Sequence, residues 1–137
     1  MSFRTLMTIK AVVCLLFGPA MVIAPGFVMS ILGVSLSADV ALPAREYGAA
    51  LCGNLLLCWF ARNAGPSNAR RAIILALLVY DAIGFLATLY TQLVGFLSPL
   101  GWLIVVIYLF FTVGFGYLWF KKSSLPAGDV REEKLLL

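Results

Sequence analysis

AIILALLVYDAIGFLATLYTQL, residues 72–93, is apolar and long enough to cross a lipid bilayer, yet it carries Asp81 near its middle. A helix that spans a membrane needs about 20 apolar residues. A carboxylate at that depth costs a few kcal/mol unless it is protonated, paired or in contact with water. Other helices must therefore pack around Asp81, and the segment predicts a small membrane protein with several spans.

The composition of the whole chain supports this interpretation. Of its 137 residues, 63% are hydrophobic and 12% are charged, and the mean hydropathy is +1.04. Soluble domains are about half apolar and about a quarter charged, so this composition belongs in lipid. The net charge is +4, but the basic residues lie at the ends of apolar runs and form no basic face. We therefore expect the lipid bilayer as a partner and no nucleic acid.

The residue types that commonly bind metals or haem are scarce. The chain has no histidine, which removes the commonest transition-metal ligand and the usual general base. Its cysteines, Cys14, Cys52 and Cys58, lie inside apolar runs without CxxC spacing, and we expect free, buried thiols. We predict no metal site and no cofactor from the residues themselves.

Four apolar runs of the length of a spanning helix follow one another. They predict an all-α fold, a four-helix transmembrane bundle over residues 1–122, followed by a disordered cytoplasmic tail over residues 123–137. The first run also resembles a signal peptide, but it continues past Pro25, and we interpret it as a retained helix. The predicted helices cover about residues 11–32, 40–61, 72–93 and 102–120.

The basic residues predict the orientation of this bundle. Two precede the first predicted helix, three lie between the second and third, and four follow the last, so nine of the ten share one side of the membrane. Only Arg45 falls on the other side. The positive-inside rule then predicts that both termini are cytoplasmic. The nine residues are Arg4, Lys10, Arg62, Arg70, Arg71, Lys121, Lys122, Arg131 and Lys134.

Polar and small residues mark the faces that should point into the bundle. In the third predicted helix, polar or small side chains recur from Asp81 at spacings of three and four, through Gly84 and Thr88 to Gln92. The second predicted helix carries Arg45 and Glu46 at its outer end and has a face of small residues that lets another helix approach closely. That face consists of Ala44, Gly48 and Cys52.

The depth of each group suggests which one pairs with Asp81. At about 1.5 Å per residue, Asp81 lies about 15 Å from the cytoplasmic end of its helix, Asn54 about 12 Å and Arg45 about 25 Å. We therefore expect Asn54, or Thr112 or Tyr108 of the fourth helix, to contact Asp81, with Arg45 as the second choice. The predicted polar core or ligand site consists of Asp81, Arg45, Glu46, Asn54, Thr88, Gln92 and Thr112.

Several kinds of catalytic chemistry are not predicted. With the helices drawn as above, no lysine lies in the middle of a span, so we expect no retinal Schiff base. The chain has no Ser/His or Cys/His arrangement, no phosphate-binding loop and no cluster of carboxylates. We identify no catalytic residue, and a non-enzymatic role is favoured over an enzymatic one.

The segment LPAREYGAALCGNLLLCWFAR, residues 42–62, resembles a motif of the broad DoxX-like grouping of small bacterial membrane proteins. In that grouping an acidic residue followed by glycine opens the second helix, and here the resemblance rests on Arg45, Glu46, Tyr47 and Gly48. The resemblance implies a four-helix bundle in the bacterial inner membrane. It also implies a quinone or lipid site, since some DoxX-type proteins are associated with quinone-linked oxidoreductases.

Two functions remain open at this point. The first is an accessory, assembly or structural subunit that self-associates or joins a larger membrane complex. The second is a protein that binds a quinone, a lipid or another amphiphile, or a small proton-coupled transporter, using Asp81 and a site formed by Arg45 and Glu46 in the outer leaflet. A cavity beside Asp81 would favour the second function, and a tightly packed interior would favour the first.

Overall fold

The computed structural model describes residues 1–121, and this part of the chain contains helices and no strand. The predicted all-helical class is therefore confirmed, while the predicted tail, residues 123–137, lies outside the described residues. The elements are α1 (Phe3–Ile23), α2 (Pro25–Ile31), α3 (Ala38–Ala61), α4 (Asn68–Leu93) and α5 (Gly101–Phe120).

Three of these helices, α1, α4 and α5, are long and apolar enough to cross a membrane. Helix α3 is long enough, with 24 residues, but it is not among the three. Its sequence explains the difference, because Asp39, Arg45 and Glu46 occupy its first half and Asn54 its second half. Three apolar helices and one more polar helix of similar length therefore form the body of the molecule.

The predicted range of the first helix, residues 11–32, is wrong. Helix α1 begins at Phe3, where the Ser2 hydroxyl accepts a hydrogen bond from the backbone N–H of Thr5. It ends at Ile23, because a residue before proline avoids the helical conformation, and Pro25 starts the separate helix α2. Lys10 consequently lies inside α1 and not on its flank.

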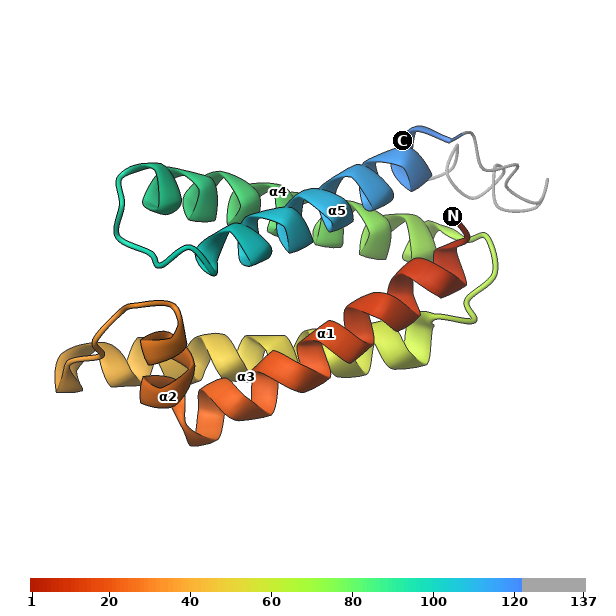
Figure 1. Ribbon diagram of the computed structural model, residues 1–137. Coiled ribbons are helices and arrows are strands. Elements are labelled where there is room, and N and C mark those ends of the chain that lie inside the picture. The colour runs from red at the N-terminus through yellow and green to blue at the C-terminus, as the bar shows by residue number, and fades with distance from the viewer. Residues whose placement is uncertain (122–137) are drawn as a thin grey trace, which may run out of the picture.

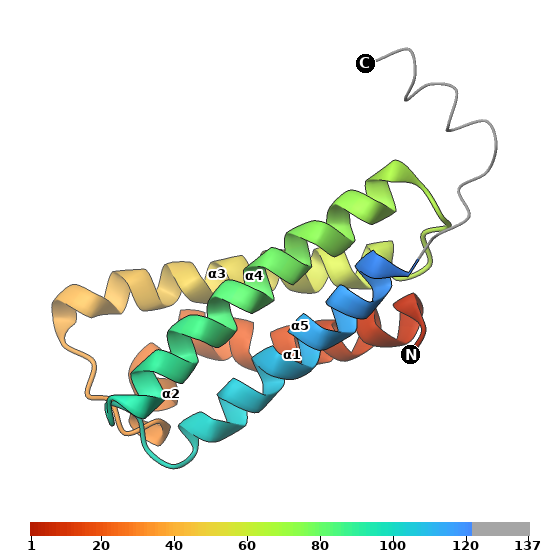
Figure 2. The ribbon, with the colours of Figure 1, turned by 90° about the horizontal axis from the view of Figure 1, so that it is seen from above.

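The helices form two antiparallel pairs that face each other. Helix α1 packs along α3 and helix α4 packs along α5, and the pairs lie one above the other in Figure 1 and cross at an angle in Figure 2. Gly48 permits the close contact within the first pair, because a Cβ atom there would lie 2.8 Å from the Val22 backbone nitrogen. Gly84 has the same role in the second pair, where a Cβ would clash with the Tyr108 ring.

The two pairs approach each other most closely at the end that carries the N-terminus (Figure 1). A cluster of buried apolar residues fills this end, and we call the region the packed half. Phe111 and Phe115 of α5 stack within it, with ring centroids 6.3 Å apart. The cluster consists of Phe3, Leu6, Met7, Ala11, Cys58, Ile74, Leu77, Phe111 and Phe115.

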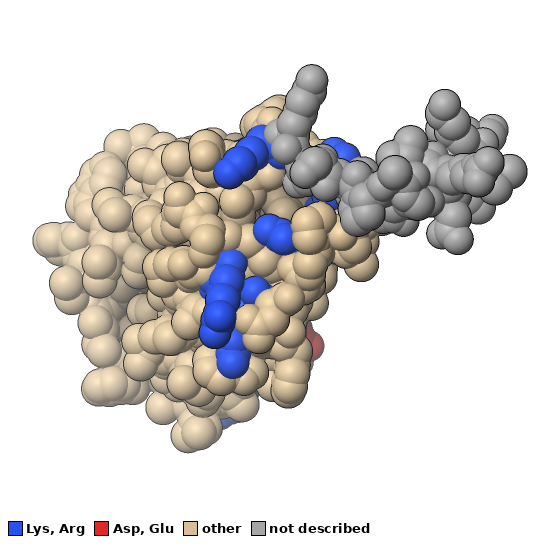
Figure 3. Space-filling view, turned by 90° about the vertical axis from the view of Figure 1, so that its right-hand side faces the viewer, with Lys and Arg blue, Asp and Glu red and all other residues tan. Residues whose placement is uncertain are grey.

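The outer surface of the packed half is basic, as Figure 3 shows. Several of its cations lie against aromatic rings: the Arg62 guanidinium is 3.4 Å from the ring centroid of Trp59, and that of Arg70 is 4.1 Å from Phe3. The acidic residues of the described chain, Asp39, Glu46 and Asp81, belong to other parts of α3 and α4. The basic residues at this end lie in or beside the first turn of α1 and α4 and the last turn of α3 and α5: Arg4, Arg62, Arg70, Arg71 and Lys121.

Candidate functional site

The centre of the candidate site is an ion pair between Lys10 of α1 and Asp81 of α4. The Lys10 Nζ atom donates a hydrogen bond to Oδ1 of Asp81. Both residues are buried, with exposed fractions of 3% for Lys10 and 0% for Asp81. The pair joins the two helix pairs of the bundle and removes both charges from contact with lipid.

The partner expected for Asp81 from the sequence is therefore wrong. Within residues 1–121, the Asp81 carboxylate forms no hydrogen bond or ion pair with any of the four residues considered as its partner. These are Asn54, Thr112, Tyr108 and Arg45. Thr112 instead donates to the Tyr108 carbonyl at 2.8 Å, and Arg45 is exposed. The expectation that Asp81 points away from lipid is confirmed by its burial.

Two aromatic rings hold the Lys10 ammonium beside the carboxylate. The Nζ atom lies 4.6 Å from the ring centroid of Phe111 and 5.2 Å from that of Tyr80. Ammonium groups are attracted to the faces of such rings, more strongly where water is excluded. The charge of Lys10 is therefore stabilised by one carboxylate oxygen and two rings from α4 and α5.

The site contains polar atoms that no described residue satisfies. Within residues 1–121, the Oδ2 atom of Asp81 and the hydroxyl of Tyr80 are buried without a hydrogen-bond partner. Leaving a buried polar group unsatisfied costs about 1–3 kcal/mol, so native structures rarely do so without a function or an additional partner. Both atoms belong to adjacent residues of α4 beside a cavity.

This cavity has a volume of about 570 Å³ and lies between the two helix pairs, beside the Lys10–Asp81 pair. Binding sites for small molecules commonly have volumes of about 300–1,000 Å³ and apolar walls with a few polar groups. We call the region around it the cavity half. Its lining includes Phe17, Met21, Met29, Leu32, Leu36, Ala44, Leu51, Gly84, Ala87, Thr88, Leu97, Ile104 and Ile107.

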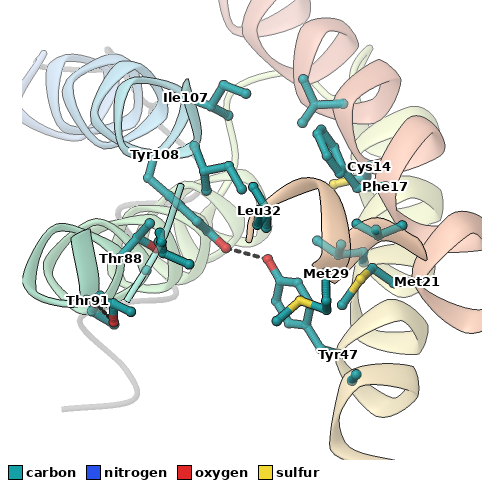
Figure 4. A pocket seen from close by; sticks show the side chains of 18 of the residues that line it. Cys14, Phe17, Met21, Met29, Leu32, Tyr47, Thr88, Thr91, Ile107 and Tyr108 are labelled. Carbon is teal, nitrogen blue, oxygen red and sulfur yellow. Dashed lines mark hydrogen bonds between the residues drawn. The ribbon is translucent and has the colours of Figure 1, made fainter. Parts of the chain in front are cut away.

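A pair of tyrosines crosses the cavity half. The hydroxyl groups of Tyr47 on α3 and Tyr108 on α5 form a hydrogen bond, seen as the dashed line in Figure 4. Tyr108 also packs near Tyr80, with ring centroids 6.4 Å apart. Polar contacts therefore connect the two helix pairs where apolar packing does not.

Helix α2 covers part of the cavity half through Val28, Met29 and Ile31. It is held in place by the loop between α4 and α5, where the backbone N–H of Ser98 donates to the Leu32 carbonyl at 2.7 Å. The Ser98 hydroxyl donates to the Ile31 carbonyl at 3.2 Å. These bonds satisfy backbone carbonyls at the end of α2 and connect the two pairs at this end of the bundle.

The other residues of the predicted site are dispersed. Thr88 lines the cavity together with Asp81. Arg45 and Glu46 are exposed, and Asn54 and Thr112 are half-buried; none of the four lines the cavity. Gln92 is buried near the α4–α5 loop, where its Nε2 donates to the Ser98 carbonyl at 3.4 Å.

Sequence reasoning missed Lys10, because a lysine at the start of an apolar run was interpreted as the end of a span. The exclusion of a lysine within a span was wrong for the same reason. A signal was present: Phe3, Met7, Lys10 and Cys14 follow helical spacing, and all four are buried. A lysine on such a face indicates a buried partner and not a flank.

The described residues offer little other reactive chemistry. No group of three His, Cys, Asp or Glu residues within residues 1–121 is placed to bind a metal ion. Cys14, Cys52 and Cys58 are free thiols, as expected; Cys14 and Cys58 are also buried, whereas Cys52 is half-buried. Comparisons with known proteins yield no relative, because no family model matches the chain and no characterised protein or solved structure is significantly similar to it. The resemblance to the DoxX-like grouping stays a prediction.

Proposed function

We propose that this protein is a multi-pass membrane protein that binds an amphiphilic molecule inside its helical bundle. The polar head of the ligand lies against the Lys10–Asp81 pair, and its apolar part occupies the cavity. One observation carries the proposal: a cavity of about 570 Å³ adjoins a buried ion pair with an unsatisfied carboxylate oxygen. Ionisable groups inside a membrane commonly belong to functional sites.

The cavity favours this function over a purely structural one. A buried pair that only joins helices works best with all its polar atoms satisfied and apolar side chains packed around it. Here the packed half has such packing, but the pair lies at its border and its Oδ2 atom has no partner in the described chain. A role as an accessory or assembly subunit explains neither the cavity nor the unsatisfied oxygen.

For the membrane arrangement we propose four crossings, by α1, α3, α4 and α5, with both termini in the cytoplasm. The basic end of the packed half supports this orientation, since basic residues favour the cytoplasmic side. Lys10 is buried and does not belong to this basic end. Single cysteines at Ser67 and Ser98, in a chain without its native cysteines, should label from opposite sides of the membrane. Labelling from the same side would contradict four crossings.

Mass spectrometry of the purified protein tests the binding function. We expect the wild type, purified in mild detergent, to retain an amphiphile that organic solvent extracts in stoichiometric amount. The variant Thr88→Phe places a ring in the cavity and should lose the molecule. Ile83→Phe adds the same ring on the exposed face of α4 and should retain it. Equal recovery from both variants, or none from the wild type, would contradict binding in the cavity.

A further inference from the structure

We propose that the basic end of the packed half (Figure 3) binds the phosphate group of an anionic phospholipid where α1, α4 and α5 meet. This surface lies outside the cavity, and the inference rests only on the proposed membrane arrangement. It is carried by the distribution of charge along the molecule, by the position of three arginines at the starts of helices and by the aromatic rings that contact two of them.

The net charge of the protein arises at this end. Its five basic residues have no acidic residue among them in the described chain, and Lys10 and Asp81 neutralise each other in the interior. The first half of α3 carries two acidic residues and one basic residue. Residues 122–137 contain three basic and three acidic residues, so they add no net charge. A surface of one sign attracts ions of the other sign.

Three of the five cations lie where a helix disfavours them. Arg4 is the second residue of α1, and Arg70 and Arg71 are the third and fourth residues of α4. The start of a helix carries a partial positive charge that favours anions, yet neither first turn contains an acidic residue. Within residues 1–121 no carboxylate pairs with these arginines. An external anion at this place reduces the repulsion among the cations and complements both helix dipoles.

Aromatic rings place two of these arginines at the level of the lipid headgroups. The guanidinium carbon of Arg70 lies 4.1 Å from the ring centroid of Phe3 on α1, and that of Arg71 lies 5.0 Å from Trp119 on α5. Tryptophan is typical of the boundary between membrane and water, where lipid phosphates lie. A ring occupies the face of a guanidinium, whereas the N–H donors lie in its plane and match the oxygens of a phosphate.

The charge of the headgroup decides which phospholipid suits this surface. Phosphatidylcholine carries an ammonium group beside its phosphate and brings no net charge. Phosphatidylglycerol brings one negative charge and has the same phosphate. Each basic residue close to an anionic membrane surface strengthens the attraction by about fivefold. The basic end should therefore retain phosphatidylglycerol in preference to phosphatidylcholine.

Native mass spectrometry tests this preference. The protein in dodecyl maltoside receives equal amounts of the two lipids with identical acyl chains, and the ratio of the bound lipids is measured. We expect an excess of phosphatidylglycerol of about tenfold or more, which Arg70→Gln/Arg71→Gln should reduce by about tenfold. Arg45→Gln also removes a positive charge, from an exposed position in the first half of α3, and should leave the excess unchanged.

The wild type provides a second test that requires no substitution. Its excess of phosphatidylglycerol should fall as the sodium chloride concentration rises, because salt screens attraction between exposed charges. Equal retention of the two lipids by the wild type, an excess that salt does not change, or an equal loss in Arg45→Gln and the double variant would overturn the inference. Displacement of the lipid by millimolar glycerol phosphate would also overturn it, since the surface would then bind a free anion. None of these results affects binding in the cavity or the four crossings, which the cysteine labelling tests separately.

Discussion

The packed half and the cavity half of this molecule are built from the same long helices but differ in how side chains fill the space between the helix pairs. In the packed half, large side chains such as Phe111 and Phe115 fill the space between the helix pairs. In the cavity half, the lining includes small residues, among them Ala44, Gly84 and Ala87. One end is therefore closely packed, and the other encloses a cavity of about 570 Å³.

The Lys10–Asp81 pair lies at the border between the halves. Phe111 belongs both to the packed cluster and to the lining of the cavity, and it contacts the Lys10 ammonium. The ion pair is therefore held by close packing on one side and lies beside the cavity on the other. This packing fixes the position of the ion pair at the edge of the cavity.

The largest expected effect is the separation of this ion pair. Asp81→Leu leaves the Lys10 ammonium buried without its counter-charge and should lower the free energy of unfolding by about 4 kcal/mol. The double variant Lys10→Met/Asp81→Leu replaces both charges by apolar groups and should recover most of that loss. Denaturant unfolding in detergent measures both. If Asp81→Leu were as stable as the double variant, the two charges would not stabilise each other in the folded protein.

Apolarity and run length suffice to predict the helical class, and they place α3, α4 and α5 within about one turn of their observed ends. These features are local, since a span must bury its own backbone groups and expose apolar side chains to lipid. The partner of Asp81 is not local. It depends on how α1 lies against α4, and a lysine inside a span is acceptable only because a residue 71 positions away neutralises it.

The cavity also cannot be predicted from the local sequence pattern. Phe17 and Phe115 are both aromatic residues in apolar runs, yet Phe17 lines the cavity while Phe115 is completely buried in the packed half. What separates them is the distance between the two helix pairs at each level, which is a property of the assembled bundle. Thr88 and Asp81 were predicted as site residues because polar side chains on one face of a helix are visible in the sequence.

The second-largest expected effect is a difference in stability between alanine variants of these two phenylalanines. Phe115→Ala should lower the free energy of unfolding by about 2 kcal/mol, less than the 3–5 kcal/mol typical of water-soluble cores, because lipid is as apolar as the protein interior. Phe17→Ala enlarges an existing cavity and should cost less than about 1 kcal/mol. The same unfolding assay measures both variants. Equal losses would mean that the two halves are equally well packed.

The smallest effect concerns the hydrogen bond between Tyr47 and Tyr108, which connects α3 to α5 across the cavity half. Interhelical hydrogen bonds in membrane proteins contribute about 0.6 kcal/mol on average, because the unfolded state in the membrane finds other partners. Tyr47→Phe keeps the ring and removes the hydroxyl, so it should lower the free energy of unfolding by about that amount. Tyr117→Phe, on an exposed position of α5, serves as the matched control and should change it by less.

If the cavity half is held mainly by such polar contacts, Tyr47→Phe should also loosen it selectively. Hydrogen–deuterium exchange should then increase in α2 and in the first turns of α3, while the amides around Phe115 remain protected. The packed half does not depend on this bond, since its helices meet through buried apolar side chains. A uniform increase in exchange along all helices would contradict the division of the bundle into two halves, because it would show that a single bond in the cavity half supports the packing of both.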